Sequence, residues 1–578
     1  MSIFRLFSVI ALVFLYGCAS TPEQVSSPKP VEKTVVLANP AIKKELKIDK
    51  NTLEPDVLFM LMTAELAGQR GQYDVAMEGY YEAAKRTRNP KLAERSAMIA
   101  MYMKDGSRLN QAVSLWLKLD PGNISARKIT ALSSFKTEDK QQAVEQLSAL
   151  LKRDPAGFEK SLFELAGALQ KDGDANFIYG VLETLSVKHP DQAVVFYVQS
   201  ILAADMKKND LAEKKIDQAL RLQPNWDKAL IMQAQLAAYE GDFQKAEGLL
   251  RNAVNKYPDN EKFTKMLAQV LIKSAKYDEA GEVYQALVAK NPKDSESLFS
   301  LGLVHLQQDR DDKAEDIFKQ LLTEAEWRNQ ASFYLGKVEE KRDNTDKALA
   351  WFDKVSEGPF EFEAAITGIS LLAKDKQFAR AEQKLAGLSG KFPKQKPRIA
   401  LIQAELYSQQ KQYEKAFAFL TDELKISPDQ PELLYSRALI ADRMGKLDIM
   451  EADLKKILAK VPDNVEALNA LGYGLTEKTT RYAEAETYLI RALKVKPDEA
   501  VILDSYGWLK YKMGDQQTAL AYLQRAYDKQ AENEIVAHLA ELLWVSGKKD
   551  EARRLFDKAF SDAPDDVYLI EFKNKFLN

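Results

Sequence analysis

Residues Asp227–Asn260 decide the fold class; they read DKALIMQAQLAAYEGDFQKAEGLLRNAVNKYPDN. Two helix-forming segments flank Gly241-Asp242, a pair that ends a helix and opens a turn. Ala234 and Ala246 lie at positions 8 and 20 of the stretch. These are the positions at which two antiparallel helices approach most closely, and a larger side chain there would cost ~1–3 kcal/mol through overpacking. The stretch therefore predicts a helix–turn–helix unit of 34 residues.

The same unit recurs along most of the chain. Prolines that cannot continue the second helix recur every 34 or 35 residues, at Pro121, Pro155, Pro190, Pro224, Pro258 and Pro292 and again at Pro359, Pro393, Pro428, Pro462 and Pro497. Alanine occupies position 20 of the unit at Ala76, Ala112, Ala143, Ala212, Ala246, Ala280, Ala314, Ala348, Ala381, Ala416, Ala485, Ala519 and Ala552. Two further units hold Ile178 and Met450 there instead. Counting them, fifteen units fit between Val57 and Asp566.

A period of 34 residues resembles that of the tetratricopeptide repeat (TPR). The resemblance predicts an all-α fold, a TPR α-α solenoid that winds as a right-handed superhelix of about fifteen helix-turn-helix repeats, with the first helix of each repeat lining a concave groove. We divide the array into an N-terminal part, residues 54–292, and a C-terminal part, residues 293–564. Residues 565–578, which include Phe572 and Phe576, predict a capping helix over the last repeat.

Composition agrees with this class and excludes others. The chain has 578 residues, too many for one compact core, and only 20 Pro and 25 Gly. Its 82 Lys and Arg nearly balance its 85 Asp and Glu, so no strong field attracts nucleic acid. One cysteine cannot form an intramolecular disulfide, and three histidines leave little material for a metal site.

The N-terminal residues predict an export signal. Residues 1–18 read MSIFRLFSVIALVFLYGC, in which Arg5 precedes an apolar run that is too short to span a bilayer. The end of this run resembles a bacterial lipobox, which implies cleavage after residue 17, lipidation of Cys18 and, because Ala19 follows, the outer membrane. The alternative is an ordinary secretory signal with a chance cysteine. Residues 18–53 would then be the lipidated N-terminus and a flexible tether that spans roughly 30–35 Å.

The sequence lacks the common motifs for nucleotide binding and for metal-dependent catalysis. The sequence contains no G-x-x-x-x-G-K-[ST], G-x-G-x-x-G or H-E-x-x-H. His538 and Glu541 share a helix face, but no second histidine completes a metal site there. We therefore expect a binding protein and not an enzyme, with no cofactor and no metal.

Two blocks carry a more specific resemblance, Leu53–Pro90 and Ala467–Phe560. Both are similar to a family of long TPR lipoproteins of proteobacteria. One member of that family is the lipoprotein partner of a periplasmic carboxy-terminal processing protease. The resemblance implies an outer-membrane, periplasm-facing adaptor that binds and activates such a protease and presents substrates such as peptidoglycan hydrolases. A scaffold for envelope assembly or exopolysaccharide export remains open, because a repeat fold does not determine a partner.

The last three repeats supply a candidate partner-binding groove. Positions 2, 5, 9 and 12 of a first helix share one side and face the groove. In these repeats they are Asn469, Tyr473, Asp504, Trp508, Tyr511, Glu541 and Trp544. Aromatic rings beside polar anchors are typical of binding hot spots. The alternative is that the rings pack against neighbouring helices and stiffen the array.

Overall fold

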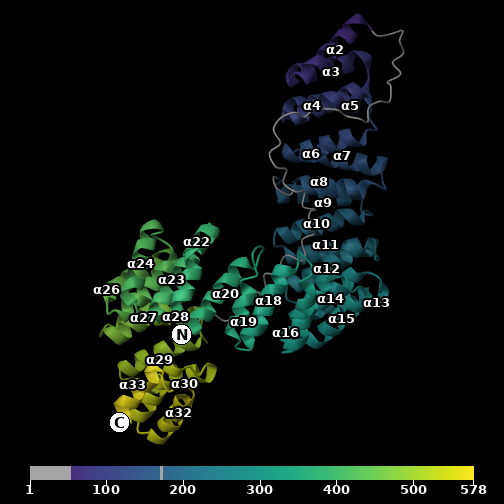
Figure 1. The fold of residues 1–578 in the computed structure, drawn as a ribbon. Helices are drawn as coiled ribbons and strands as arrows, with labels where there is room; N and C mark the ends of the chain where they lie inside the picture. The colour runs from purple at the N-terminus through teal and green to yellow at the C-terminus, as the bar shows by residue number, and fades with distance from the viewer. Residues whose placement is uncertain (1–53, 170–172, 578) are drawn as a thin grey trace. The chain divides into compact units, whose positions relative to one another are not determined.

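The computed structural model describes residues 54–169 and 173–577, and within these ranges the chain is all α-helical, without a β-strand. Figure 1 shows successive helices lying side by side in pairs. The predicted all-α solenoid of paired helices is therefore confirmed. The signal peptide, Cys18 and the tether lie outside the described residues.

Contacts divide the array into two compact units, the first ending at Pro224 and the second beginning at Asn225. The first unit contains α2 (Pro55–Gln69), α3 (Tyr73–Thr87), α4 (Pro90–Tyr102), α5 (Gly106–Leu119), α6 (Ile124–Lys136), α7 (Lys140–Arg153), α8 (Phe158–Leu169), α9 (Ala175–Lys188), α10 (Ala193–Asp205) and α11 (Asn209–Leu222).

The second unit contains α12 (Asp227–Tyr239), α13 (Phe243–Lys256), α14 (Glu261–Lys273), α15 (Tyr277–Lys290), α16 (Ser295–Gln307), α17 (Asp311–Leu321), α18 (Arg328–Lys341), α19 (Thr345–Phe352), α20 (Glu361–Lys374), α21 (Phe378–Ala386), α22 (Leu388–Lys391), the 3₁₀ helix η1 (Pro393–Gln395), α23 (Lys396–Gln409), α24 (Tyr413–Ile426), α25 (Pro431–Arg443), α26 (Leu447–Lys460), α27 (Val465–Lys478), α28 (Tyr482–Val495), α29 (Ala500–Lys512), α30 (Gln516–Lys529), α31 (Asn533–Val545), α32 (Lys549–Asp562) and α33 (Val567–Phe576). The division between residues 292 and 293 falls inside this unit, where α15 packs against α16.

The two helices of a pair approach each other closely, which explains why alanine recurs at position 20. Every alanine predicted at position 20, from Ala76 to Ala552, is fully buried. The turn within a pair, between its first and second helix, also follows the prediction. Gly241 has a φ of +81°, a left-handed conformation that favours glycine. The carboxylate of Asp242 then accepts a hydrogen bond from the backbone N–H of Lys245 at 2.9 Å and caps α13.

The two units without alanine at position 20 use a neighbouring glycine instead. A Cβ built on Gly474 would lie 2.7 Å from Cε of Met450, and one built on Gly173 would lie 2.8 Å from Cδ1 of Ile178. Contacts that short do not occur between real side chains, so the absent Cβ makes room for the larger residue. The irregular repeats are therefore compensated locally.

Helix α33 covers the end of the last repeat. Leu569 and Phe572 are buried in one apolar cluster with residues of α31 and α32. The Asp566 carboxylate caps this helix by accepting hydrogen bonds from the backbone N–H groups of Tyr568 and Leu569, at 3.0 and 3.2 Å. No helix in the described part of the chain is long and apolar enough to span a membrane.

Candidate functional site

The predicted groove residues lie on three first helices of the second unit. Asn469 and Tyr473 belong to α27, the residues from Asp504 to Tyr511 to α29, and Glu541 and Trp544 to α31. These helices pack directly on one another, α27 on α29 and α29 on α31. The structure therefore brings the seven predicted residues to one region, as their repeat positions require.

A histidine that the prediction did not include lies at the centre of this region. The ring of His538 stacks on the indole of Trp508, with centroids 3.9 Å apart and planes 15° apart. Its Nδ1 lies 3.1 and 3.0 Å from the two carboxylate oxygens of Asp504. Trp508 is 5% exposed, Asp504 4% and His538 7%. The indole is thus part of the interior, as the packing alternative for these rings anticipates.

Trp508 and Tyr473 each bond a carboxylate from another repeat through their polar atom. Trp508 Nε1 donates to Oε1 of Glu477 at 2.5 Å, which joins α29 to α27. The hydroxyl of Tyr473 donates to Oε1 of Glu534 at 2.8 Å, which joins α27 to α31 across an intervening repeat.

The remaining predicted residues lie at the edge of this region. The hydroxyl of Tyr511 donates to Oε1 of Glu541 at 3.1 Å, and Lys575 Nζ of the capping helix donates to the same oxygen at 2.7 Å. The Trp544 ring contacts Phe572 and Phe576 of the capping helix at centroid distances of 6.2 and 6.0 Å.

Asn469 differs from its neighbours. Its Oδ1 is buried without a hydrogen-bond partner, as is Oδ1 of Asp442 on α25. Tyr511, Glu541 and Trp544 are partly exposed. A partner that approached this face would meet these edge residues first, since Trp508 is enclosed. That the face binds a partner stays a prediction.

Burial and charge shift the pKa values of this cluster. Burial by itself would lower the pKa of His538, but the nearby carboxylates of Asp504, Glu534 and Glu477 outweigh it, so the pKa is raised. Burial also raises the pKa of Glu534. For Tyr511, burial and then the carboxylate of Glu541 raise the pKa to about 12. The cluster therefore favours a protonated histidine among carboxylates.

Sequence reasoning missed Glu534, His538 and Glu477 as members of this cluster. Glu534 lies two helical turns before Glu541 on the same stripe, so its repeat position was an available signal. His538 and Glu477 lie beside the groove positions in the repeat, and periodicity alone gave no sign that the ring of His538 is buried or that Glu477 accepts a hydrogen bond from Trp508. Neither the cluster nor any other group of acidic, histidine or cysteine residues in the described ranges has the arrangement of a metal site.

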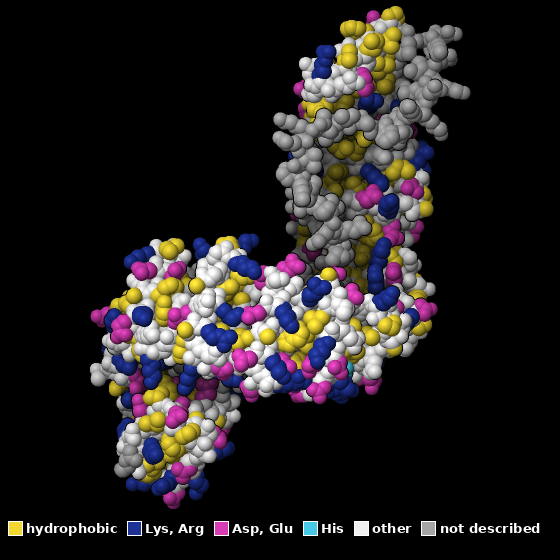
Figure 2. Space-filling view, in the orientation of Figure 1, with side chains coloured by type: hydrophobic (Ala, Val, Ile, Leu, Met, Phe, Trp, Pro, Cys, Tyr) yellow, Lys and Arg dark blue, Asp and Glu magenta, His cyan; other side chains and the backbone are white. Residues whose placement is uncertain are grey.

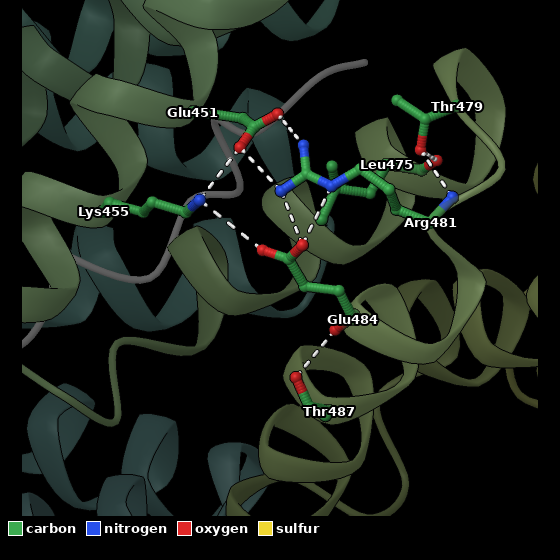
Figure 3. Close-up of polar contacts among 7 residues, drawn as sticks. All are labelled: Glu451, Lys455, Leu475, Thr479, Arg481, Glu484 and Thr487. Atoms are coloured by element: carbon green, nitrogen blue, oxygen red, sulfur yellow. Dashed lines mark hydrogen bonds and ion pairs between the residues drawn. The ribbon is translucent and has the colours of Figure 1, made fainter.

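A second polar network lies between the second helices α26 and α28, and it is far more exposed (Figure 3). Arg481 donates from Nη1 to Oε1 of Glu451 and from Nη2 to Oε2 of Glu484, each at 2.5 Å. Lys455 lies between these carboxylates, 2.9 and 3.5 Å from them. Arg481 and Lys455 are 42% and 44% exposed, so salt and water screen this network. It connects α26 to α28 but provides no reactive group.

In the first unit, the most exposed apolar surface lies on α2. Leu58, Phe59, Met62 and Leu66 share one side of this helix and are 49%, 72%, 57% and 49% exposed. Figure 2 shows hydrophobic side chains gathered over this end of the unit. Contiguous exposed apolar side chains are typical of protein contact surfaces.

Comparisons with known proteins agree with the repeat pattern. The tetratricopeptide repeat profiles match residues 237–301, 510–574 and 297–332. TPR repeat-containing protein PA4667 of Pseudomonas aeruginosa is 35% identical over 543 residues, which cover 92% of this chain and 89% of the relative. The chain belongs to the tetratricopeptide repeat family. Such repeats are scaffolds for protein–protein interaction and are generally non-catalytic.

Solved structures of the family are similar in part. Yeast Tom70 matches 89% of this chain and 98% of its own with 16% identity and a TM-score of 0.35. TTC0263, a thermophilic TPR protein of Thermus thermophilus, matches 31% of this chain and 99% of its own with 24% identity and a TM-score of 0.29.

Proposed function

We propose that this chain is a non-catalytic adaptor of the bacterial periplasm, anchored in the outer membrane through a lipid on Cys18. In this role it binds and activates a carboxy-terminal processing protease and presents envelope substrates such as peptidoglycan hydrolases. The observation that carries the proposal is the extent of the array: paired helices of one repeat type occupy the described chain from Pro55 to Asp562. A long array suits an adaptor because it offers separate surfaces to an enzyme and to its substrate.

Two features support a role in binding. The repeats of a solenoid pack mainly on their neighbours, which leaves the outer side of the array available to partners. The apolar side of α2 adds exposed surface of the kind that partner proteins cover. The resemblance of Leu53–Pro90 and Ala467–Phe560 to the adaptor family supports the choice of partner.

The test is reconstitution with the protease of the same organism. The purified full chain should cleave neither casein nor peptidoglycan, should co-purify with the protease, and should raise its turnover of a physiological substrate. The same chain after heat unfolding is the control. Unchanged turnover together with no co-purification would refute the adaptor role and would favour a scaffold for envelope assembly or exopolysaccharide export.

Photo-crosslinking then shows which surface binds. A crosslinking residue in place of Phe59 reports on the α2 face, and one in place of Tyr239 on α12 is a control of equal exposure, since the two side chains are 72% and 73% exposed. A crosslinker in place of Trp544 reports on the edge of the predicted groove.

A further inference from the structure

Polar bonds between repeats hold together α27, α29 and α31, the first helices of the last three repeats. Asp504 and His538 join α29 to α31, and Tyr473 and Glu534 join α27 to α31. The second bond spans 61 residues, almost two repeats, and connects helices that are not neighbours in the repeat order. The inner side of α27, α29 and α31 is therefore occupied by the chain's own side chains.

His538 is the one histidine of this cluster, and carboxylates surround it. On α29, Asp504 contacts its Nδ1 directly. On α27, Glu477 contributes a second negative charge, and on its own helix Glu534 contributes a third. The α27 hydroxyl of Tyr473, whose ring centroid is 6.2 Å from that of His538, is neutral because burial raises its pKa.

Few basic groups offset these charges. Lys512 of α29 pairs with Glu477 at 3.2 Å. Tyr568 of α33 shares a hydrogen bond with Glu534, and Arg443 of α25 acts on that tyrosine. The positive charge nearest Asp504 is thus the one that His538 itself carries when it is protonated.

We propose that protonated His538 is a clasp that holds the inner sides of α27, α29 and α31 together, and that this end of the array loosens when the proton leaves. Neutral His538 can still donate from Nδ1 to Asp504. It no longer offsets the negative charge of Asp504, which water screens little because that carboxylate is buried, or the charge of the partly buried Glu534 nearby. The proposal does not depend on the identity of the partner.

The sign of the pH effect follows from the direction of the shifts. The pKa of His538 is raised in the folded chain. Its contribution to stability is therefore complete below the ordinary histidine pKa of about 6.5, and it disappears as pH rises through the folded value. The pKa of Glu534 is also raised, because burial favours its neutral form, so its ionisation weakens the same region with rising pH.

The test begins with NMR titration of the histidine ring protons of the full chain. There are three histidines, so replacing each in turn, His189→Gln, His305→Gln and His538→Gln, assigns every signal. The expected result is that the His538 signal titrates above the ordinary value, whereas that of His305, whose pKa burial lowers, titrates below it. A His538 signal that titrates at or below the ordinary value would overturn the proposal.

Hydrogen exchange of the wild-type chain gives the second readout and needs no variant. Protection of α27–α33 should fall relative to α12–α15 as pH passes the His538 midpoint. Each unit by which the pKa exceeds its ordinary value corresponds to as much as a roughly tenfold loss of protection. A ratio that stays constant would overturn the proposal.

Asp504→Asn separates the clasp from a purely structural role. It removes the charge that faces His538 but nearly preserves the shape. The clasp predicts that both midpoints move to lower pH. If protection fell equally at every pH and the midpoints did not move, the residues would be structural and the proposal would fail. Should this variant not fold, the two wild-type measurements still decide.

Discussion

Replacing Trp508 by alanine is the sharpest test of how the last repeats are held together. The indole is 5% exposed, stacks on His538 and donates a hydrogen bond to Glu477. Alanine would remove both the stacking and the hydrogen bond and leave a cavity between α29 and α31. We therefore expect a loss of stability, with any loss of partner binding following from it.

The magnitude can be worked from these contacts. A buried Trp→Ala change typically costs ~3–5 kcal/mol, because the lost apolar transfer energy adds to the energy of the cavity. Glu477 would keep its ion pair with Lys512 at 3.2 Å, so it would not become an isolated charge. Trp508→Phe keeps a ring against His538 and loses mainly the indole N–H, so it should cost about 2 kcal/mol, as is typical of a hydrogen bond to a charged acceptor.

The assay is urea unfolding of the full chain, followed by circular dichroism and by hydrogen exchange of α29–α31. Exchange is needed because a long repeat array can lose its end repeats before the rest. Tyr239→Ala is the matched control, since that ring is 73% exposed and should change stability by no more than ~0.5 kcal/mol. If Trp508→Ala unfolded like the control yet abolished partner binding, our reasoning would be wrong and the residue would belong to a binding surface.

Three further predictions concern packing, surface charge and anchoring. Gly336→Ala should cost ~1–3 kcal/mol in a urea melt, because its new Cβ would meet the ring of Phe352, whereas Gly248→Ala in an open helical site should gain up to ~1 kcal/mol. Arg481→Ala should leave the unfolding midpoint unchanged at physiological salt and lower it slightly at low salt, because the Arg481 side chain is 42% exposed and salt screens its ion pairs. Cys18→Ala should move the protein out of the outer-membrane fraction, and an unchanged distribution in membrane fractionation would contradict lipid anchoring.

The sequence alone predicts the architecture because small residues must recur wherever helices approach closely. All the alanines at position 20 are buried, as expected from overpacking. What periodicity could not show is how an irregular repeat restores its packing. Met450 is larger than alanine, and the space it needs comes from Gly474 on α27 of the next repeat. That compensation joins two repeats, so no pattern within a single unit reveals it.

The sequence predicts where the candidate site lies, but it does not predict that the indole of Trp508 is buried there. Repeat positions correctly assign Tyr473, Asp504 and Trp508 to one side of their helices, since that follows from helical geometry. Whether such a side is open or filled depends on how closely successive first helices pack, which is a property of the stacking and not of any single repeat. Here α27 and α31 approach closely enough for Tyr473 to reach Glu534. Tyr473 is therefore partly buried and Trp508 lies in the interior, although the sequence suggests both as a binding surface.

The two ends of the described array also differ in how much apolar surface they expose. A terminal repeat lacks one neighbour, so its outer side must be covered or left in contact with solvent. At the C-terminal end α33 covers α31 with Phe572 and adds the ion pair of Lys575 with Glu541. On α2, by contrast, Phe59 and Met62 remain largely exposed. Contacts with a partner therefore gain more from burial at α2, because the last repeats have already satisfied most of their apolar and polar groups internally.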